Sequence, residues 1–232
     1  MNSTPHSEFR FKDCSTCESR AGSLFCTAPK EALEHLNACK INKSFRKGQV
    51  LFDAGQVAQG IYCVNSGTIC VERISSTGNA FILRIASAGD ILGCRALFSG
   101  EHYHATAVAK EDCTVCIIPT SAINSLFLEH PSVAVEFLSS LTKELGQGED
   151  RMVALVHKNA QERIAESVLY LKQHHSSQKW TRREIAEWAG TTPETVMRTL
   201  STFEKDGLVE LQGRDILIKD KPALVERANI SY

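Results

Sequence analysis

The chain has 232 residues, of which 43% are hydrophobic and 23% charged, and its formal net charge is −1. These values are typical of a globular protein of one or two domains, and the near-neutral charge gives no global argument for nucleic-acid binding. The sequence contains no run of about 18 apolar residues, so we expect no transmembrane helix. The N-terminus lacks the basic and apolar regions of a signal peptide, so we expect a cytoplasmic protein without a membrane partner.

The first 38 residues are polar and contain Cys14, Cys17 and Cys26. The nine cysteines of the chain are many for a reducing compartment, where such a number indicates metal or redox chemistry before disulfides. A Cys-x-x-Cys turn brings two thiolates to one metal centre, and both zinc and an iron–sulfur cluster accept four thiolates. The alternative is a mobile tail with incidental cysteines. A short amphipathic helix is predicted over residues 29–38.

Residues 39–130 contain short runs of Val, Ile, Phe and Tyr separated by glycines. Regular strands without a long helix between them predict a β-sandwich or barrel. The clearest local prediction is a hairpin with strands at residues 68–74 and 80–85.

A long helix is predicted from residue 131 to residue 158, because apolar residues recur there with alternating spacings of four and three. This repeat gives a narrow apolar seam and predicts a homodimer, whereas a single long core helix is the alternative. The predicted seam consists of Leu138, Leu141, Leu145, Gly148, Met152 and Leu155.

Residues 159–232 begin with another amphipathic helix and then show a helix-turn-helix pattern. Thr181 and Glu184 form a capping box for one helix, which ends at Gly190. Thr192 then caps a second helix with Pro193 at its first position. Two short strands around a glycine turn follow and predict a wing. This order indicates winged-helix DNA binding, whereas the alternative is a packed helical hairpin without function.

The β-rich region contains Phe45-Arg-Lys-Gly-Gln-Val-Leu-Phe52, Ala54-Gly55, Gly60-Ile-Tyr62 and Gly89-Asp90. In these motifs the chain resembles the cyclic-AMP receptor/FNR family of transcription regulators over nearly its whole length. The resemblance implies an α+β protein with a jelly-roll sensor domain, a dimerisation helix and a C-terminal winged helix-turn-helix domain.

The family comparison argues against cyclic AMP as the effector. Cyclic-nucleotide binders of this fold hold the ribose with a glutamate and the phosphate with an Arg-Ser pair, and the matching positions here are Cys94, Tyr103 and His104. Neither tyrosine nor neutral histidine supplies the bidentate cation that a phosphodiester needs. A haem, as in gas-sensing relatives, stays an alternative, although no pairing singles out one of the eight histidines.

The same resemblance points to a [4Fe–4S] cluster, because the oxygen-sensing FNR branch binds one through three N-terminal cysteines and one cysteine in a late strand. The late cysteine matches Cys116 in Cys-Ile-Ile-Pro, and Cys113 competes with it, although residues 113 and 116 point to opposite faces of a strand. The implied ligands are Cys14, Cys17, Cys26 and Cys116, with Cys26 shifted from its family spacing. The remaining five cysteines, Cys63 among them, are interpreted as small buried hydrophobic residues.

Glu194 and Arg198 match the family's reading pair for a TGA-like half-site in a palindrome. Glutamate accepts from cytosine N4, and arginine binds guanine O6 and N7. Met197 stands where FNR proteins carry serine, so the identity of the outer bases of the half-site is not predicted. Ser201 shares the same helix face. Candidate phosphate contacts, of which at least half are expected to be simple solvated charges, are Arg182, Arg183, Lys205 and Arg214.

The sequence therefore predicts a homodimeric regulator that binds double-stranded DNA, responds to oxygen, redox stress or nitric oxide, and by resemblance contacts RNA polymerase. A haem- or small-ligand-responsive regulator, or a metal-binding redox protein, is the alternative. No catalytic motif appears, so we expect no enzyme. The FNR branch carries a repelling aspartate at the position of Gly148, and its absence here predicts that the cluster-free protein stays dimeric.

Overall fold

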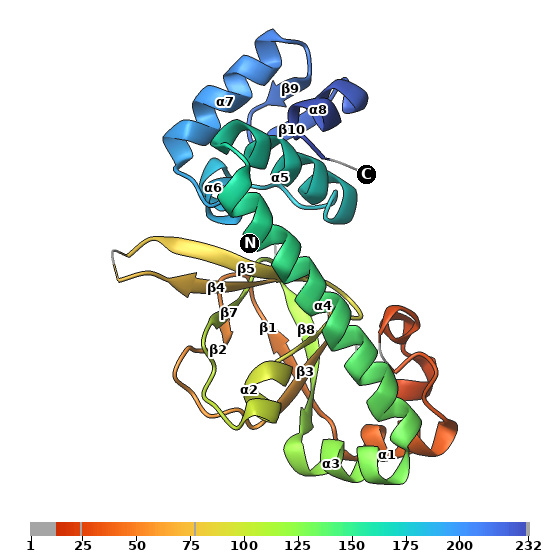
Figure 1. Cartoon of the computed structure of the whole chain (residues 1–232). Coiled ribbons are helices and arrows are strands. Elements are labelled where there is room, and N and C mark those ends of the chain that lie inside the picture. The colour runs from red at the N-terminus through yellow and green to blue at the C-terminus, as the bar shows by residue number, and fades with distance from the viewer. Residues whose placement is uncertain (1–12, 24, 77, 231–232) are drawn as a thin grey trace, which may run out of the picture. The chain divides into compact units, whose positions relative to one another are not determined.

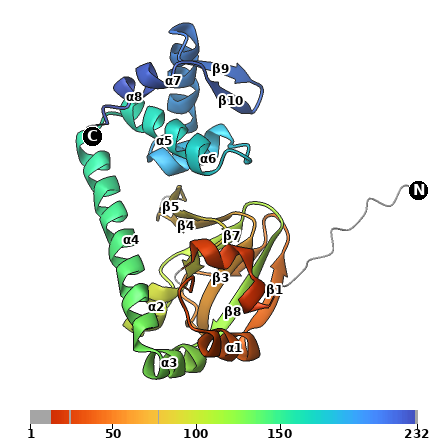
Figure 2. The ribbon, with the colours of Figure 1, turned by 90° about the vertical axis from the view of Figure 1, so that its right-hand side faces the viewer.

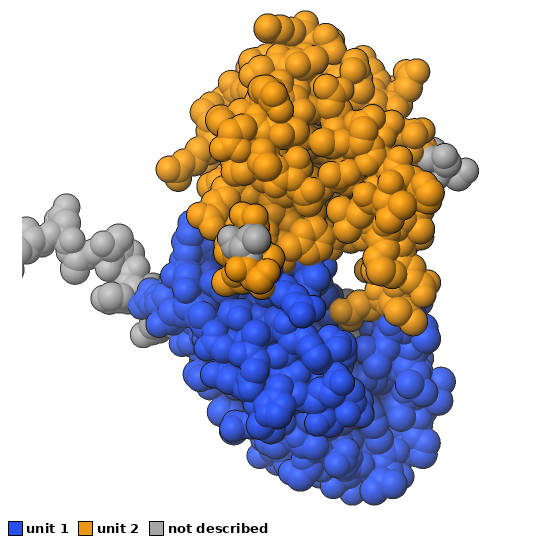
Figure 3. Space-filling view, turned by 60° about the vertical axis from the view of Figure 1, so that its left-hand side comes forward, with its two compact units in different colours: residues 1–73, 83–143 blue, residues 74–82, 144–232 orange. Residues whose placement is uncertain are grey.

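The computed structural model describes residues 13–23, 25–76 and 78–230. The chain forms two compact units, shown in different colours in Figure 3. The first contains residues 1–73 and 83–143, and the second contains residues 74–82 and 144–232. Among the described residues, no helix is long and apolar enough to cross a membrane.

The first unit is built on two four-stranded sheets, with the strand orders β1-β8-β3-β6 and β2-β7-β4-β5 (Figure 1). The predicted hairpin is present as β4 and β5, within one residue of its expected bounds. The strands are β1 (Ile41–Phe45), β2 (Val50–Phe52), β3 (Gly60–Ser66), β4 (Ile69–Ile74), β5 (Ala80–Ala86), β6 (Ile91–Leu92), β7 (Thr106–Ala109) and β8 (Cys113–Pro119). Together with the helices described below, they confirm the predicted α+β class.

Short helices cover the outer face of the first sheet. They are the 3-10 turns η1 (Cys14–Thr16) and η2 (Glu18–Gly22) and the helices α1 (Lys30–Cys39), α2 (Cys94–Ser99) and α3 (Thr120–Glu129). Figure 2 shows the N-terminal turns, in red, lying over β3. Ala32 and Leu36 of α1 pack with Ile61 of β3 and Ile118 of β8 in one core under these helices. The helix expected at residues 29–38 is thus confirmed as α1.

Strand β8 separates two cores, because successive side chains of a strand point to opposite faces of its sheet. Cys113 and Val115 lie in the core between the two sheets, with Val64 of β3. Ile118 lies in the core on the outer face, under the short helices, with Cys63 packed against that core. Residues of β8 with odd and even numbers therefore face different environments.

Helix α4 (Pro131–His157) closely matches the long helix predicted over residues 131–158. Val133 and Phe137 near its start are buried in the first unit. Three residues spaced by seven are exposed: Leu138 by 61%, Leu145 by 62% and Met152 by 60%. Gly148 and Leu155 are exposed as well, so five of the six predicted seam residues, all but Leu141, are accessible to a partner helix.

The second unit contains a helix-turn-helix and a two-stranded wing. Its core includes Ile164, Ile185, Leu200 and Phe203, none of which is more than 1% exposed. Thr181 and Glu184 form the expected capping box, and Gly190 ends that helix with φ 64°. Beyond residues 144–157 of α4, the elements are α5 (Ala160–His174), α6 (Arg182–Ala189), α7 (Pro193–Lys205), β9 (Val209–Gln212), β10 (Asp215–Ile218) and α8 (Lys221–Arg227).

Candidate functional site

A cavity on the outer face of the first sheet brings four cysteines together. It is lined by Cys14 and Cys17 from the N-terminal segment, Cys63 from β3 and Cys116 from β8. All four thiols are free and partly buried. Three of the four predicted cluster ligands, Cys14, Cys17 and Cys116, therefore line one cavity.

Hydrogen bonds hold the two N-terminal cysteines against the domain. The backbone N–H of Cys14 donates to Oδ1 of Asn37 on α1 over 3.3 Å. The Cys17 thiol donates to Oδ1 of Asn65 on β3, also over 3.3 Å. Asn65 is fixed in turn, because its amide donates to the Thr114 hydroxyl over 3.0 Å. The segment is thus tied both to α1 and to the sheet.

Two cationic side chains add positive charge to the cavity. Nζ of Lys40 lies 3.5 Å from the Cys14 sulfur. Arg20 also lines the cavity, and its Nη1 donates to the backbone carbonyl of Cys26 over 3.0 Å. Among the described residues, the buried Nε of Arg20 has no hydrogen-bond partner. A buried donor without a partner costs free energy, so this atom is suited to an acceptor that enters the cavity.

Burial raises the pKa of the Cys14 thiol, while Lys40 opposes the rise. Burial is also the main cause of the raised pKa of Cys116, which Lys40 again opposes. The Cys14 and Cys116 thiols are therefore protonated at neutral pH, and the binding of a metal centre would release their protons.

The donor set fits an anionic, thiolate-bound metal centre, because sulfur ligands and two cations face one space. In the described part of the chain, however, no three His, Cys, Asp or Glu side chains lie close enough to hold a metal ion. Cys26 is exposed and does not line the cavity, although its carbonyl is held by Arg20. The thiols must therefore move closer together to bind a cluster.

Cys63 was not singled out by the sequence, where it is one of five cysteines expected to be plain buried residues. The register places Cys63 directly opposite Cys116. Strand pairing was needed to find it, because a single sequence gives no register between strands 50 residues apart. Cys113, the predicted competitor of Cys116, lies fully buried between the sheets, away from the cavity face.

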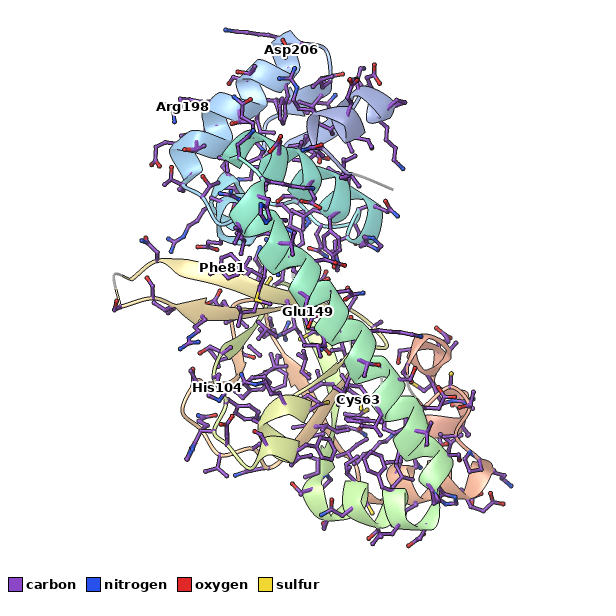
Figure 4. The ribbon with its side chains drawn as sticks, viewed as in Figure 1. Cys63, Phe81, His104, Glu149, Arg198 and Asp206 are labelled. Carbon is purple, nitrogen blue, oxygen red and sulfur yellow. The ribbon has the colours of Figure 1, made fainter. Side chains whose placement is uncertain are left out.

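Aromatic rings fill the interior of the jelly roll near the expected nucleotide pocket. The ring centroids of Phe52 and Tyr103 are stacked 4.0 Å apart, and the centroids of Phe52 and Tyr62 are 5.2 Å apart. Cys94 is buried at the start of α2, whereas Nε2 of His104 lies 2.9 Å from a carboxylate oxygen of Glu101 (Figure 4). Tyr103 is thus packed among aromatic rings, and His104 is paired with Glu101, a carboxylate that Arg95 also approaches to 3.4 Å.

Helix α7 presents the predicted base-reading residues. Glu194, Met197, Arg198 and Ser201 are all exposed, while Val196, Leu200 and Phe203 are buried. Figure 4 shows Arg198 projecting outward from α7. The pKa of Glu194 is lowered by hydrogen bonds from its own backbone and from Thr192, so it is ionised and able to accept from a base.

The candidate phosphate contacts differ in their surroundings. Arg182 donates to the backbone carbonyl of Gly213 in the wing turn over 3.3 Å. Arg183 forms an ion pair with Glu187 at 2.8 Å. Arg214 and Lys205 are exposed. Arg182 thus has a structural contact, whereas Arg214 and Lys205 are the stronger candidates for DNA phosphates.

Comparisons with known proteins agree with this architecture. Residues 42–130 match the family description of the cyclic nucleotide-binding domain, and residues 162–227 match that of the Crp-like helix-turn-helix domain. Together these two modules define a DNA-binding transcription regulator.

Similar full-length proteins narrow this class. The chain is 30% identical to the fumarate and nitrate reduction regulatory protein of Escherichia coli, over 93% of this chain and 90% of that protein. It is also 30% identical to the anaerobic regulatory protein of Pasteurella multocida, over 92% and 81%. The solved structure of FixK2 from Bradyrhizobium japonicum matches with a TM-score of 0.74 and 25% identity, covering 83% of this chain and 99% of FixK2.

The chain therefore belongs to the CRP/FNR family of transcription regulators, and its similarity to FNR proteins supports the FNR-like branch. These relatives are regulators, which confirms the prediction that the chain is not an enzyme. The predicted jelly roll and winged helix-turn-helix are confirmed as well.

Proposed function

We propose that the protein is a homodimeric transcription regulator that responds to oxygen or related redox signals through a [4Fe–4S] cluster. The observation that carries this proposal is the convergence of Cys14, Cys17 and Cys116 on one cavity with Arg20 and Lys40. The names of its relatives, which refer to fumarate and nitrate reduction and to anaerobic regulation, agree with such a signal.

The proposed ligands are Cys14, Cys17, Cys26 and Cys116. Cys26 is the further ligand that the family resemblance implies, although it is shifted from the family spacing. The bond from Arg20 to its carbonyl keeps its backbone next to a side chain that lines the cavity. Cys63, which already lines the cavity, is the competing fourth thiol. A bound iron–sulfur cluster supplies a centre that oxygen or nitric oxide destroys.

The residues around this cavity have separate roles in the proposal. Asn37 and Asn65 orient the two N-terminal cysteines through the hydrogen bonds described above. Lys40 and Arg20 offset the negative charge of a thiolate-ligated centre, because opposite charges at short range favour the ionised thiols. A bound centre would add a link from the N-terminal segment to β8 through Cys116, and its loss would leave the hydrogen bonds to Asn37 and Asn65.

The output is DNA binding by α7 of two protomers. Glu194 and Arg198 read the core of a TGA-like half-site, and Leu138, Leu145 and Met152 form the centre of the dimer seam. Paired reading helices on a palindrome need a fixed spacing, so a change at α4 alters affinity for DNA. RNA polymerase is the proposed downstream partner.

Anaerobic purification tests the sensor. The expected product is brown, has a broad absorbance band, and contains iron and sulfide in a ratio of about one. It should bind a palindrome of TGA-like half-sites more tightly before exposure to air than after. Colourless anaerobic protein with unchanged DNA affinity would refute the cluster, and stoichiometric zinc would assign the cavity to a structural metal.

A further inference from the structure

Cys63 and Cys116 are directly opposite each other in neighbouring antiparallel strands. In the pairing of β3 with β8, Cys63 is aligned with Cys116, and the adjacent aligned pairs are Tyr62 with Ile117 and Val64 with Val115. Directly opposite residues in an antiparallel pair have Cα atoms about 4.5–5.5 Å apart and side chains on the same face. A disulfide needs a Cα separation of about 4.4–6.8 Å. The backbone is therefore already spaced for a bond between these two sulfurs.

Cys63 and Cys116 share the cavity with Cys14 and Cys17, but only Cys63 and Cys116 are directly opposite each other in paired strands. Both are free, partly buried and line the same cavity. Burial raises the pKa of Cys63 well above its ordinary value, and among the neighbouring thiols the one with the largest further effect is Cys116. Cys113 lies between the sheets, and burial raises its pKa to about 11. Cys113 is thus separated from the cavity thiols by the strand itself.

We propose that Cys63 and Cys116 form a reversible intramolecular disulfide when the protein without a metal centre meets a peroxide. In the first step the Cys116 sulfur attacks one oxygen of hydrogen peroxide and the O–O bond breaks. Cys116 becomes a sulfenic acid, and the departing hydroxide takes up the Cys116 thiol proton and leaves as water. The Cys63 sulfur then attacks the Cys116 sulfur and forms the S–S bond. The hydroxyl group of the sulfenic acid leaves with the Cys63 proton as a second water.

The electrons balance in this sequence. The two thiols lose two electrons and two protons, and one peroxide is reduced to two waters. Cys116 reacts first because its side chain is less enclosed than that of Cys63. Its thiol faces β1, where it donates to Oδ1 of Asn42 over 3.4 Å. A dithiol reductant reverses the bond by thiol–disulfide exchange.

A consequence for regulation rests on the proposed function. Cys116 is one of the proposed ligands, so the disulfide occupies a sulfur that a returning cluster needs. Peroxide would then delay recovery of the regulator after the oxidant has gone, until a thiol reductant acts. The protein would therefore stay unable to bind a cluster for some time after the oxidant has disappeared.

The chemical test uses the full-length protein, freed of metal by chelation and treated with stoichiometric hydrogen peroxide. Remaining thiols are blocked with maleimide, the protein is digested, and peptides are sequenced by tandem mass spectrometry. We expect a linked pair of peptides containing Cys63 and Cys116 that disappears after dithiothreitol. Cys63→Ser should abolish the link and leave Cys116 as a stable sulfenic acid that a dimedone probe labels.

Cys39→Ser is the matched control, because Cys39 is also partly buried and packs against the same core. This variant should keep the Cys63–Cys116 link. Absence of the link in wild-type protein, or a peroxide-induced link that survives Cys63→Ser, would overturn the proposal. This outcome is independent of whether the anaerobic protein contains a cluster.

A second measurement tests the regulatory consequence. Iron and sulfide are added anaerobically to peroxide-treated protein, with and without prior dithiothreitol, and bound iron is counted. We expect at least a fivefold loss of iron uptake that dithiothreitol restores, and the same loss and recovery in the control Cys39→Ser, which keeps the link. If the link forms but iron uptake is unchanged, the disulfide is supported and the proposal that it blocks the return of a cluster is refuted.

Discussion

The guanidinium carbon of Arg151 lies 3.8 Å from the ring centroid of Trp188, and one Nη of the same arginine donates to the backbone carbonyl of Trp188 over 3.1 Å. The same nitrogen also donates to the carbonyl of Ile82 over 3.1 Å, and the guanidinium is 5.4 Å from the ring of Phe81 (Figure 4). Within the second unit, one side chain of α4 therefore connects residues 74–82, the tip of the β4–β5 hairpin, to the helix-turn-helix.

We expect Arg151→Ala to lower the free energy of unfolding of the second unit by about 2–4 kcal/mol, because a desolvated cation–π contact and two charged hydrogen bonds are lost. Both tryptophans of the chain, Trp180 and Trp188, belong to this unit, so their fluorescence in urea reports on it. Arg183→Ala removes an ion pair with Glu187 in which the arginine side chain is exposed, and it should cost less than about 1 kcal/mol. Equal effects of the two variants would contradict the assigned role of Arg151.

Gly190→Ala should destabilise the second unit for two reasons. Its φ of +64° is unfavourable for alanine, and a Cβ there would lie 2.8 Å from Cδ2 of Leu155 and 3.3 Å from a ring carbon of Phe81. Gly207→Ala is the control, since Gly207 has φ +74° with nothing within 4 Å of a Cβ. We expect about 1–2 kcal/mol for the control and more for Gly190→Ala, with Leu155→Ala recovering part of the difference in a double-mutant cycle.

Iron analysis of anaerobically purified variants should identify the fourth ligand of the proposed cluster. Under the proposed assignment, Cys26→Ala loses most of its iron, as Cys116→Ala does, whereas Cys63→Ala retains it. The exposed Cys26 thiol must move into the cavity for this result. Retained iron in Cys26→Ala, together with lost iron in Cys63→Ala, would assign the fourth position to β3 instead.

DNA binding by α7 predicts two different kinds of defect. Arg198→Ala should weaken binding to a TGA-like palindrome by about 1–3 kcal/mol and relax the preference for guanine at one position. Lys205→Ala should weaken binding to all sequences similarly and reduce the salt dependence by about one phosphate contact. Fluorescence anisotropy over a salt series, with a scrambled duplex for comparison, separates the two. A loss confined to one base in Lys205→Ala would contradict its phosphate role.

Sedimentation of the metal-free protein should show a dimer, because the seam carries no aspartate at Gly148 and exposes Leu138, Leu145 and Met152. Leu145→Glu places a charge at the centre of this seam and should give a monomer. Leu128→Glu is the control, since Leu128 is 83% exposed but lies on α3. A clean monomer of the unmutated metal-free protein would contradict this expectation and restore the model in which charge repulsion separates the metal-free protomers.

The elements of this fold were predictable because local signals agree with tertiary structure. The capping box of Thr181 and Glu184, the left-handed Gly190 and the Thr192-Pro193 start of α7 each act within a few residues. The exposed face of α7 follows from the helical period alone. These positions needed no information from distant parts of the chain.

The composition of the thiol cavity was less predictable, because it depends on strand register and on side chains far apart in sequence. Cys14, Cys17 and Cys116 were named from resemblance, yet Cys63, Arg20 and Lys40 line the same space. The seam shows the same limit. The 4-3 spacing included Leu141, which packs partly against the core of the first unit, because a heptad pattern does not say how much of its stripe the chain covers itself.

Because side chains alternate along β8, this one strand separates the apolar core between the sheets from the thiol cavity on the outer face. Thr114 fixes its position, since its hydroxyl lies 2.7 Å from the Ser66 hydroxyl and accepts from Asn65 over 3.0 Å at the point where the β3–β8 register shifts. Deleting a single residue between Thr114 and Cys116 would turn the Cys116 sulfur inward, among hydrocarbon side chains. In homologues in which this short segment differs in length by one residue, the matching thiol should therefore point inward. Such a thiol would be shielded from metal and from peroxide.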